Sequence, residues 1–254
     1  MFSVIICSID PVKFSQILKH YQHLFGSEPS ELIGIHDARS MAEGYNRGLA
    51  RARGEFLIFC HDDIEFISPT DWLNRLKNHL AKFDMIGLAG TTKLVHPKWF
   101  QAGPPYIFGQ VAHVGGIPKW PEPYGVTIYS TPSACVSGIQ ALDGLFIAVR
   151  RQVLERVKFD EKTFEGFNCY DIDFTFTAYL ADFKLAVACD LPVIHQSRGK
   201  FNETWLRDAQ KFLIKHASQL APEKNRQFHW TNVAANTRDE LVMRMLPSHV
   251  RSLL

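Results

Sequence analysis

The chain has 254 residues, of which 46% are hydrophobic and 21% charged. This composition excludes a disordered or fibrous protein, and the length allows one large domain with a sizeable core. The formal net charge is +2, and no block of Lys and Arg forms the basic stripe of a nucleic-acid-binding protein, so we expect no nucleic-acid partner.

The cysteines and the hydrophobicity pattern indicate the compartment. The five cysteines are widely spaced and form no C-x-x-C pair, and three of them lie within apolar runs, namely Cys7, Cys60 and Cys189. This usage favours a reducing compartment over a disulfide framework. The N-terminal apolar run is too short for a signal peptide, and no stretch approaches the ~20 apolar residues of a spanning helix. We therefore predict a cytoplasmic protein without a transmembrane segment.

The N-terminal third alternates between apolar strands and amphipathic helices. Strands are expected at 2–9, 31–37, 55–63 and 85–90, and helices at 14–21, 41–49 and 71–82. The first of these helices carries apolar residues at the i, i+3, i+4, i+7 spacing of a buried stripe. The alternation predicts an α/β fold with a Rossmann-like, mostly parallel central sheet that is covered by helices on both faces.

The rest of the chain has a different character. Pro, Gly and aromatic residues are frequent over 91–138, which predicts a small region of irregular structure with short antiparallel strands. Beyond it we expect a strand and helix over 141–157, a helix over 169–183, a strand and short segment over 184–196 and a helix over 205–213. The predicted organisation is a single domain over 1–220, followed by a C-terminal helical tail over 221–254.

Acidic residues follow the first three predicted strands. Asp10, Asp37 and the triplet His61-Asp62-Asp63 lie where the carboxyl ends of parallel strands meet, which is where ligands bind in such sheets. The turn after the first strand contains no glycine, so it is no dinucleotide cradle, and no Walker loop occurs. A divalent cation held by carboxylates would neutralise bound phosphates instead. An Asp pair at a strand end is about equally often a solvated turn, so both interpretations stay open here.

The stretch SMAEGYNRGLARARGEFLIFCHDDIEF, residues 40–66, resembles the nucleotide-sugar region of family-2 glycosyltransferases, which have the GT-A fold. In that family a helix with an Asn leads through A-x-G-E into a strand that ends on a metal-binding D-x-D. The resemblance implies a donor-site role for Asn46 and a divalent cation, Mn²⁺ or Mg²⁺, held by Asp63. His61 replaces the first acid of the motif and is a further candidate ligand, and Asp62 is assigned to nucleotide-sugar binding with a possible share in the metal site.

The first two strands extend this resemblance. SVIICSID (3–10) and IGIHDARS (33–40) are similar to the strands that contact the nucleotide in the family. The resemblance implies that Ser8 and Asp10 contact the nucleotide and that Asp37 binds the nucleobase, for which a carboxylate can accept an N–H hydrogen bond. Residues 1–90 are thereby expected to be the nucleotide-binding half.

Residues 141–196 resemble the acceptor half of the same family, so 91–200 is expected to bind the acceptor. The resemblance implies that Asp171 is the catalytic base, that His195 completes the metal site and that Asp143 and Gly144 contact the acceptor. Acids in a first helical turn also stabilise the helix itself, and Asp173 is interpreted as either structural or acceptor-binding. Of the aromatic residues over 99–129, most are expected to pack internally, with Trp120 assigned to the acceptor.

Two departures from the family pattern leave alternatives open. His61 replaces an acid, and Tyr170 stands where the family commonly has Glu before Asp171. We interpret the chain as an inverting glycosyltransferase that moves a sugar from a nucleoside-diphosphate sugar to a hydroxyl of a sugar, lipid-linked or small-molecule acceptor. The alternatives are a non-catalytic relative that binds nucleotide or glycan and, less favoured, a nucleotidyltransferase. The amphipathic stretch 239–246 either covers the domain's own core or contacts a membrane peripherally.

Overall fold

The computed structural model describes residues 1–67, 70–115, 123–222 and 230–246. Trp120, a predicted acceptor residue, lies outside the described residues. No helix within these ranges is long and apolar enough to cross a membrane.

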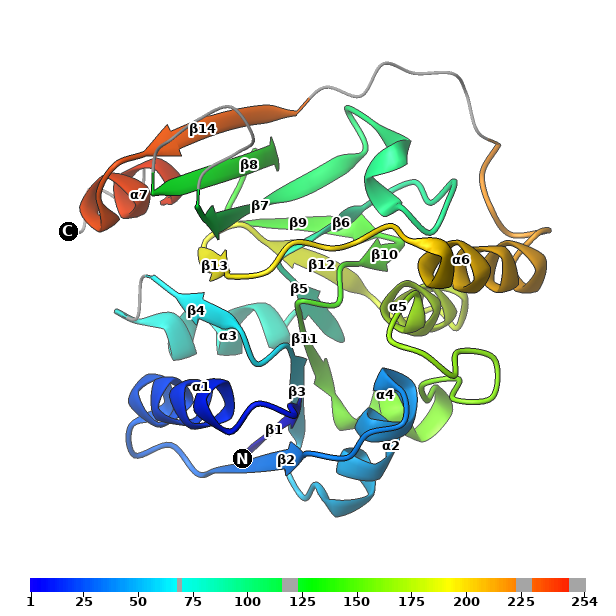
Figure 1. The fold of residues 1–254 in the computed structure, drawn as a ribbon, viewed down its shortest axis with the longest axis horizontal. Coiled ribbons are helices and arrows are strands. Elements are labelled where there is room, and N and C mark those ends of the chain that lie inside the picture. The colour runs from blue at the N-terminus through cyan, green and yellow to red at the C-terminus, as the bar shows by residue number, and fades with distance from the viewer. Residues whose placement is uncertain (68–69, 116–122, 223–229, 247–254) are drawn as a thin grey trace.

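A seven-stranded central sheet runs through the molecule in the order β2-β1-β3-β11-β5-β12-β9 (Figure 1). Its strands are β1 (Phe2–Cys7), β2 (Ser30–Ile35), β3 (Phe56–Cys60), β5 (Met85–Gly87), β9 (Cys135–Ile139), β11 (Phe146–Arg150) and β12 (Leu185–Ala188). The pairs β1–β2, β1–β3 and β5–β12 are parallel, whereas β11 runs antiparallel to both β3 and β5, and β9 antiparallel to β12. The α/β fold class and the mostly parallel sheet are confirmed, since β2, β1, β3, β5 and β12 share one direction. The sheet is mixed rather than purely parallel, because β11 and β9 run in the reverse direction.

Helices cover both faces of the central sheet, as predicted (Figure 1). Helices α1 (Pro11–Phe25) and α3 (Trp72–Leu80) lie on one face, and α2 (Met41–Arg51), α4 (Arg151–Arg156) and α5 (Tyr170–Leu180) lie on the other, with α6 (Glu203–Lys215) beside α5. Helices α1 and α2 begin at side-chain caps: Asp10 accepts from the backbone N–H of Val12 and Lys13, and Ser40 from that of Glu43. The apolar core fills the space between sheet and helices.

A second, largely antiparallel sheet lies beyond β9 and β12 (Figure 1). It has the order β10-β6-β7-β13-β4, and β7 also pairs with β8, which in turn pairs with β14. Its strands are β4 (Ile64–Phe66), β6 (Ala89–Thr91), β7 (Ile107–Val114), β8 (Tyr124–Ser130), β10 (Ala141–Leu142), β13 (Val193–His195) and β14 (Thr231–Ala235). A short 3₁₀ helix, η1 (Trp99–Ala102), precedes β7. The region expected to be mostly irregular thus contains two long strands, β7 and β8.

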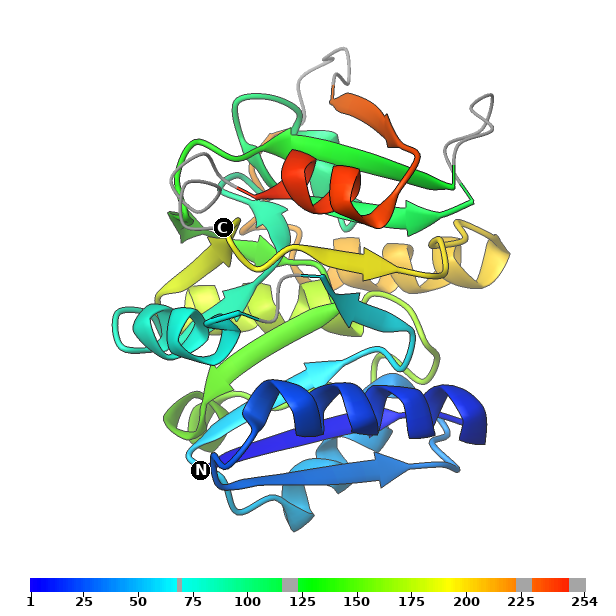
Figure 2. The ribbon, with the colours of Figure 1, turned by 90° about the vertical axis from the view of Figure 1, so that its left-hand side faces the viewer.

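The C-terminal segment is more than the helical tail that the sequence suggested. Helix α7 (Arg238–Met245) is present, but β14 precedes it and pairs antiparallel with β8. Figure 2 shows α7 against β8 and β14. Leu241 and Met245 of α7 are buried in an apolar cluster with residues of the second sheet. These apolar residues cover the protein's own core.

The two sheets meet where β3 ends. The chain leaves the central sheet at Cys60 and enters the second sheet at Ile64, so His61-Asp62-Asp63 bridges the two. Strand β13 pairs antiparallel with β4, which places His195 opposite Ile64. The junction therefore gathers side chains from segments more than a hundred residues apart in the sequence.

Candidate active site at the junction of the two sheets

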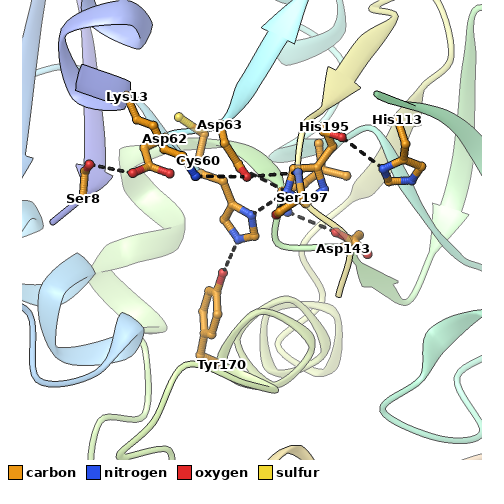
Figure 3. Close-up of polar contacts among 12 residues, drawn as sticks. Ser8, Lys13, Cys60, Asp62, Asp63, His113, Asp143, Tyr170, His195 and Ser197 are labelled. Atoms are coloured by element: carbon orange, nitrogen blue, oxygen red, sulfur yellow. Dashed lines mark hydrogen bonds and ion pairs between the residues drawn. The ribbon is translucent and has the colours of Figure 1, made fainter. Parts of the chain in front are cut away.

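Two histidines and one aspartate converge at this junction (Figure 3). His61 Nδ1 lies 3.2 Å from His195 Nε2, and the same His195 nitrogen lies 3.2 Å from Asp63 Oδ1. One ligating atom from each of the three residues falls within 4.8 Å of the others. This arrangement brings together the three predicted metal ligands, which the chain supplies from two separate strand ends.

The ionisation of these residues suits cation binding. Burial of the ring and the neighbouring His195 lower the pKa of His61 to about 4, so its imidazole is neutral at pH 7. Burial alone would raise the pKa of Asp63, but hydrogen bonds from His195 and Ser197 outweigh it and hold that pKa well below its usual range. Neutral imidazole and ionised carboxylate are the forms that ligate metals. Because imidazole accompanies the carboxylate, the donor set fits Mn²⁺ better than Mg²⁺, which prefers oxygen ligands alone.

The two departures from the family pattern touch one another. The Tyr170 hydroxyl lies 3.0 Å from His61 Nε2, on the opposite side of the ring from His195 (Figure 3). Tyr170 is 4% exposed and packs edge-on against Tyr45. A hydrogen-bonding partner on the far nitrogen fixes the orientation of a ligating imidazole. The tyrosine thus orients His61 so that Nδ1 faces the cluster.

Asp171 lies at the start of α5 against a tight turn of the chain. Its Oδ2 accepts the backbone N–H of Gly144 at 2.7 Å. A Cβ at position 144 would lie 2.6 Å from the Asp171 Cβ and 2.8 Å from the Tyr170 hydroxyl, so only glycine allows this approach. Asp143, next to it, accepts from Trp99 Nε1 at 2.9 Å and from the Leu145 N–H at 3.1 Å. The Asp143-Gly144 pair predicted from the sequence therefore adjoins Asp171.

The environment of Asp171 makes it a proton acceptor at neutral pH. Burial and the nearby carboxylate of Asp143 raise the pKa of Asp171 to about 7, against hydrogen bonds that favour the charged form. A base whose pKa lies near the working pH is ionised in a useful fraction of molecules and still has a high affinity for a proton. The half-buried carboxyl and His61 both line a cavity of about 170 Å³.

The predicted nucleotide-binding residues have different surroundings. Ser8 donates to Asp62 Oδ2 at 2.6 Å, which joins the ends of β1 and β3 beside the cluster (Figure 3). Asp10 is occupied as the cap of α1. Asp37 is exposed and forms an ion pair with Arg47 at 2.7 Å. The structure brings Ser8 and Asp62 to the site, whereas Asp10 serves the helix and Asp37 lies at the surface.

Two further predicted residues are not brought to the cavity. Asn46 points its amide nitrogen at the carbonyl of Phe159, 2.8 Å away, and ties α2 to that loop. Asp173 is buried and accepts from His216 Nε2 at 2.7 Å and from Lys215. The reason is helical geometry: two residues along an α-helix turn the side chain by about 200°, so Asp173 faces away from Asp171. Of the two interpretations of Asp173, its contacts are those of the structural one.

Sequence reasoning missed several residues of this site. Lys13 Nζ lies 3.8 Å from Asp63 Oδ2, and Ser197 donates its backbone N–H to the same oxygen at 3.2 Å. The sequence marks Trp99 only as one of many aromatic residues, although it holds Asp143. Lys13 stands in the first turn of α1, soon after β1 ends, and a basic residue near a phosphate site is a usable signal. Ser197 carries no such signal, because its role depends on the pairing of β13 with β4.

Residues 3–216 match the model of a family described as glycosyltransferase-like. The chain belongs to this glycosyltransferase-like family. A curated relative from Fuscovulum blasticum, named "ATP synthase subunits region ORF 6", is 24% identical over a match of 233 residues, and the match covers 85% of this chain and 83% of the relative. That name describes a genomic region and adds nothing on chemistry.

Two solved structures are similar in fold. The mannosyltransferase PcManGT from Pyrobaculum calidifontis, in complex with GDP-Man and Mn²⁺, has a TM-score of 0.52 at 13% identity, covering 87% of this chain and 65% of that one. GalNAc-T7 with UDP, GalNAc and Mn²⁺ has a TM-score of 0.51 at 12% identity, covering 84% and 47%. The predicted GT-A fold of this family member is thereby confirmed, and the chain spans less than two thirds of either structure.

Proposed function

We propose that this member of the family is an inverting glycosyltransferase that moves a sugar from a nucleoside-diphosphate sugar to an acceptor hydroxyl. One observation carries the proposal: a carboxylate with a raised pKa, Asp171, and the candidate ligand His61 line the same cavity. Inverting transfer needs a base for the acceptor on one side and charge neutralisation for the leaving diphosphate on the other. In this proposal Asp171 is the base, and a cation bound at His61 would supply the charge.

Asp171 is the general base in this proposal. Ionised, it removes the proton of the acceptor hydroxyl as the oxygen attacks the anomeric carbon, and the diphosphate leaves from the opposite face. The backbone N–H of Gly144 donates to Asp171 Oδ2, and together with the other backbone hydrogen bonds it holds the carboxyl where it lines the cavity. Tyr170 sits where the family commonly has an acid, so Asp171 acts alone.

Asp63, His61 and His195 would hold the divalent cation. When bound, the cation supplies positive charge that stabilises the leaving diphosphate. Lys13 beside Asp63 adds a second positive charge. The hydrogen bond from Ser8 to Asp62 joins the ends of β1 and β3, which belong to the half of the domain expected to bind the nucleotide. We retain Asp37 as the nucleobase contact, for which it would have to exchange its ion pair with Arg47 for a base N–H.

Calorimetric titration tests the donor site first. UDP, GDP, dTDP and CDP are each titrated with Mn²⁺, Mg²⁺ or EDTA into wild type and Asp63→Ala. We expect one nucleotide to bind in a metal-dependent manner, more tightly with Mn²⁺, and to lose that dependence in Asp63→Ala. Equal nucleotide affinity with metal and with EDTA would refute the proposed metal centre.

The reaction is tested with the sugar nucleotide of the diphosphate that binds. We expect slow hydrolysis or transfer that Asp171→Asn abolishes while nucleotide binding stays within twofold of wild type. NMR of the first-formed product gives its anomeric configuration, and retention would exclude the single displacement. Metal-dependent binding without any turnover would instead support a non-catalytic nucleotide-binding relative.

A further inference from the structure

A second cavity, of about 550 Å³, extends from the candidate metal ligands His61 and His195 toward the second sheet. His61, His195 and Asp143 form its inner end. The rest of its wall consists of side chains of the second sheet and adjoining loops, among them Trp99, Tyr129, Phe201, Trp230, Thr127 and Asn232. The volume lies in the range of small-ligand sites. A ligand in this cavity would have one end beside the candidate catalytic groups.

An aromatic network forms one side of the cavity. Trp99 is 4% exposed and is anchored by its bond to Asp143, and its ring lies 4.7 Å from that of Tyr129 in an edge contact. The Tyr129 ring lies 6.0 Å from that of Trp230, which also meets Phe100 at 5.7 Å. Trp230 is 36% exposed. The network therefore runs from the carboxylate beside Asp171 to an accessible tryptophan at the outer end.

The outer end belongs to a part of the chain that the family match does not include. The match stops at residue 216, whereas Trp230 and β14 follow it. Pairing of β14 with β8 sets Asn232 opposite Thr127, and the Thr127 hydroxyl donates to Asn232 Oδ1 at 3.2 Å. The C-terminal segment thus completes this cavity with an exposed indole and an amide, Trp230 and Asn232, two residues apart in the sequence.

The lining has the chemistry that recognises a sugar ring. A pyranose has an apolar face of C–H groups, which packs on an aromatic ring, and a rim of hydroxyls, which need amide, hydroxyl or charged partners. Trp230 and Phe201 offer the first, and Asn232, Thr127 and Arg198 offer the second. A polyprenyl chain would cover these polar groups without offering them hydrogen bonds, which is costly. The mixture favours a carbohydrate over a lipid tail.

We propose that this cavity is a carbohydrate acceptor site, in which Trp230 of the C-terminal segment is the stacking platform and Asn232 a hydroxyl-binding group. The inference rests on the proposed function, since the cavity ends at His61, His195 and Asp143, which that function assigns to the metal and the acceptor. Asp171 lines the adjoining smaller cavity. It adds the class of acceptor, a glycoside, and it assigns a binding role to residues beyond the family match. The acceptor hydroxyl would enter from the second sheet and reach Asp171 past Asp143.

Saturation-transfer NMR tests this site. The probes are the methyl glycosides of glucose, galactose, mannose and N-acetylglucosamine, with farnesyl phosphate as the apolar probe, each added with the nucleoside diphosphate that binds. Wild type is compared with Trp230→Ala, Trp230→Phe and the control Met243→Ala. Met243 is an exposed residue of α7 in the same C-terminal segment and lines neither cavity.

We expect at least one glycoside to bind wild type and the Met243→Ala control equally. Binding should be about tenfold weaker in Trp230→Ala and partly restored in Trp230→Phe. Equal glycoside binding in Trp230→Ala, no glycoside binding in wild type, or a preference for farnesyl phosphate would each overturn the acceptor assignment. The nucleotide affinity is expected to be the same in all variants and in wild type. If wild type bound no nucleotide, the proposed function would be overturned, so this result is distinguishable from a failure of the acceptor assignment alone.

Discussion

Asp171→Asn is expected to stabilise the protein at the same time as it removes activity. The carboxyl of Asp171 is held beside Asp143 and away from much of the solvent, and this raises its pKa from 3.8 to about 7. An asparagine has nearly the same shape and keeps an oxygen that accepts the Gly144 N–H, but it carries no charge. The substitution therefore removes the cost of ionisation and leaves the local hydrogen bond in place.

The magnitude follows from the difference in pKa between the folded and unfolded chain. Below pH 3.8 the carboxyl is protonated in both states and costs nothing. As the pH rises from 3.8 to about 7, the unfolded chain loses its proton first, so the stability of wild type falls, and above pH 7 the loss is constant. A span of about 3 pH units corresponds to about 4 kcal/mol. Because Asp171 is only half-buried, we take about 2 to 4 kcal/mol as the expected range.

Urea denaturation at several pH values measures this effect. We expect Asp171→Asn to match wild type near pH 4 and to exceed its free energy of unfolding by about 2 to 4 kcal/mol at pH 8. Asp173→Asn, two residues along the same helix, is the control and should lose stability, because it leaves His216 and Lys215 without their buried partner. Parallel pH curves for wild type and Asp171→Asn would refute the reasoning.

The remaining predictions concern the neighbours of these groups. Tyr170→Phe should weaken Mn²⁺ binding by about 10- to 100-fold in calorimetry, because His61 loses the partner that orients it. The control Tyr21→Phe removes a buried hydroxyl bonded to Cys60 and should leave the Mn²⁺ affinity unchanged. Equal losses of Mn²⁺ affinity in the two variants would contradict the role assigned to Tyr170. Gly144→Ala should abolish transfer and lower the free energy of unfolding by about 1 to 3 kcal/mol, since its Cβ would collide with Asp171; a melting temperature and turnover equal to those of wild type would show that the turn tolerates the methyl group.

Local patterns in the sequence determined most of the N-terminal half. The apolar strands and amphipathic helices up to residue 90 follow from the spacing of apolar residues, which depends only on neighbours in the chain. The order of the motifs along the chain indicates the GT-A fold without knowledge of any contact. His61, Asp63 and His195 were expected as one metal site, and the structure does place them together. What the spacing could not reveal was the reversed strand β11, because strand direction is set by packing across the sheet rather than by local pattern.

The tertiary structure alone decided the surroundings of the candidate groups. The contact between Tyr170 and His61 joins residues 109 positions apart, and no sequence signal connects a tyrosine to a distant histidine. Asp171 and Asp173 are both acids of one first helical turn, and the resemblance alone left Asp173 open between a structural and an acceptor-binding role. The turn of the helix places Asp171 at the cavity and Asp173 against His216. The tail that looked like a simple helix supplies β14 and Trp230, because a short strand forms only when a partner edge such as β8 satisfies its backbone. The types of residue available for chemistry follow from the sequence, whereas the contacts of each side chain depend on how distant segments pack.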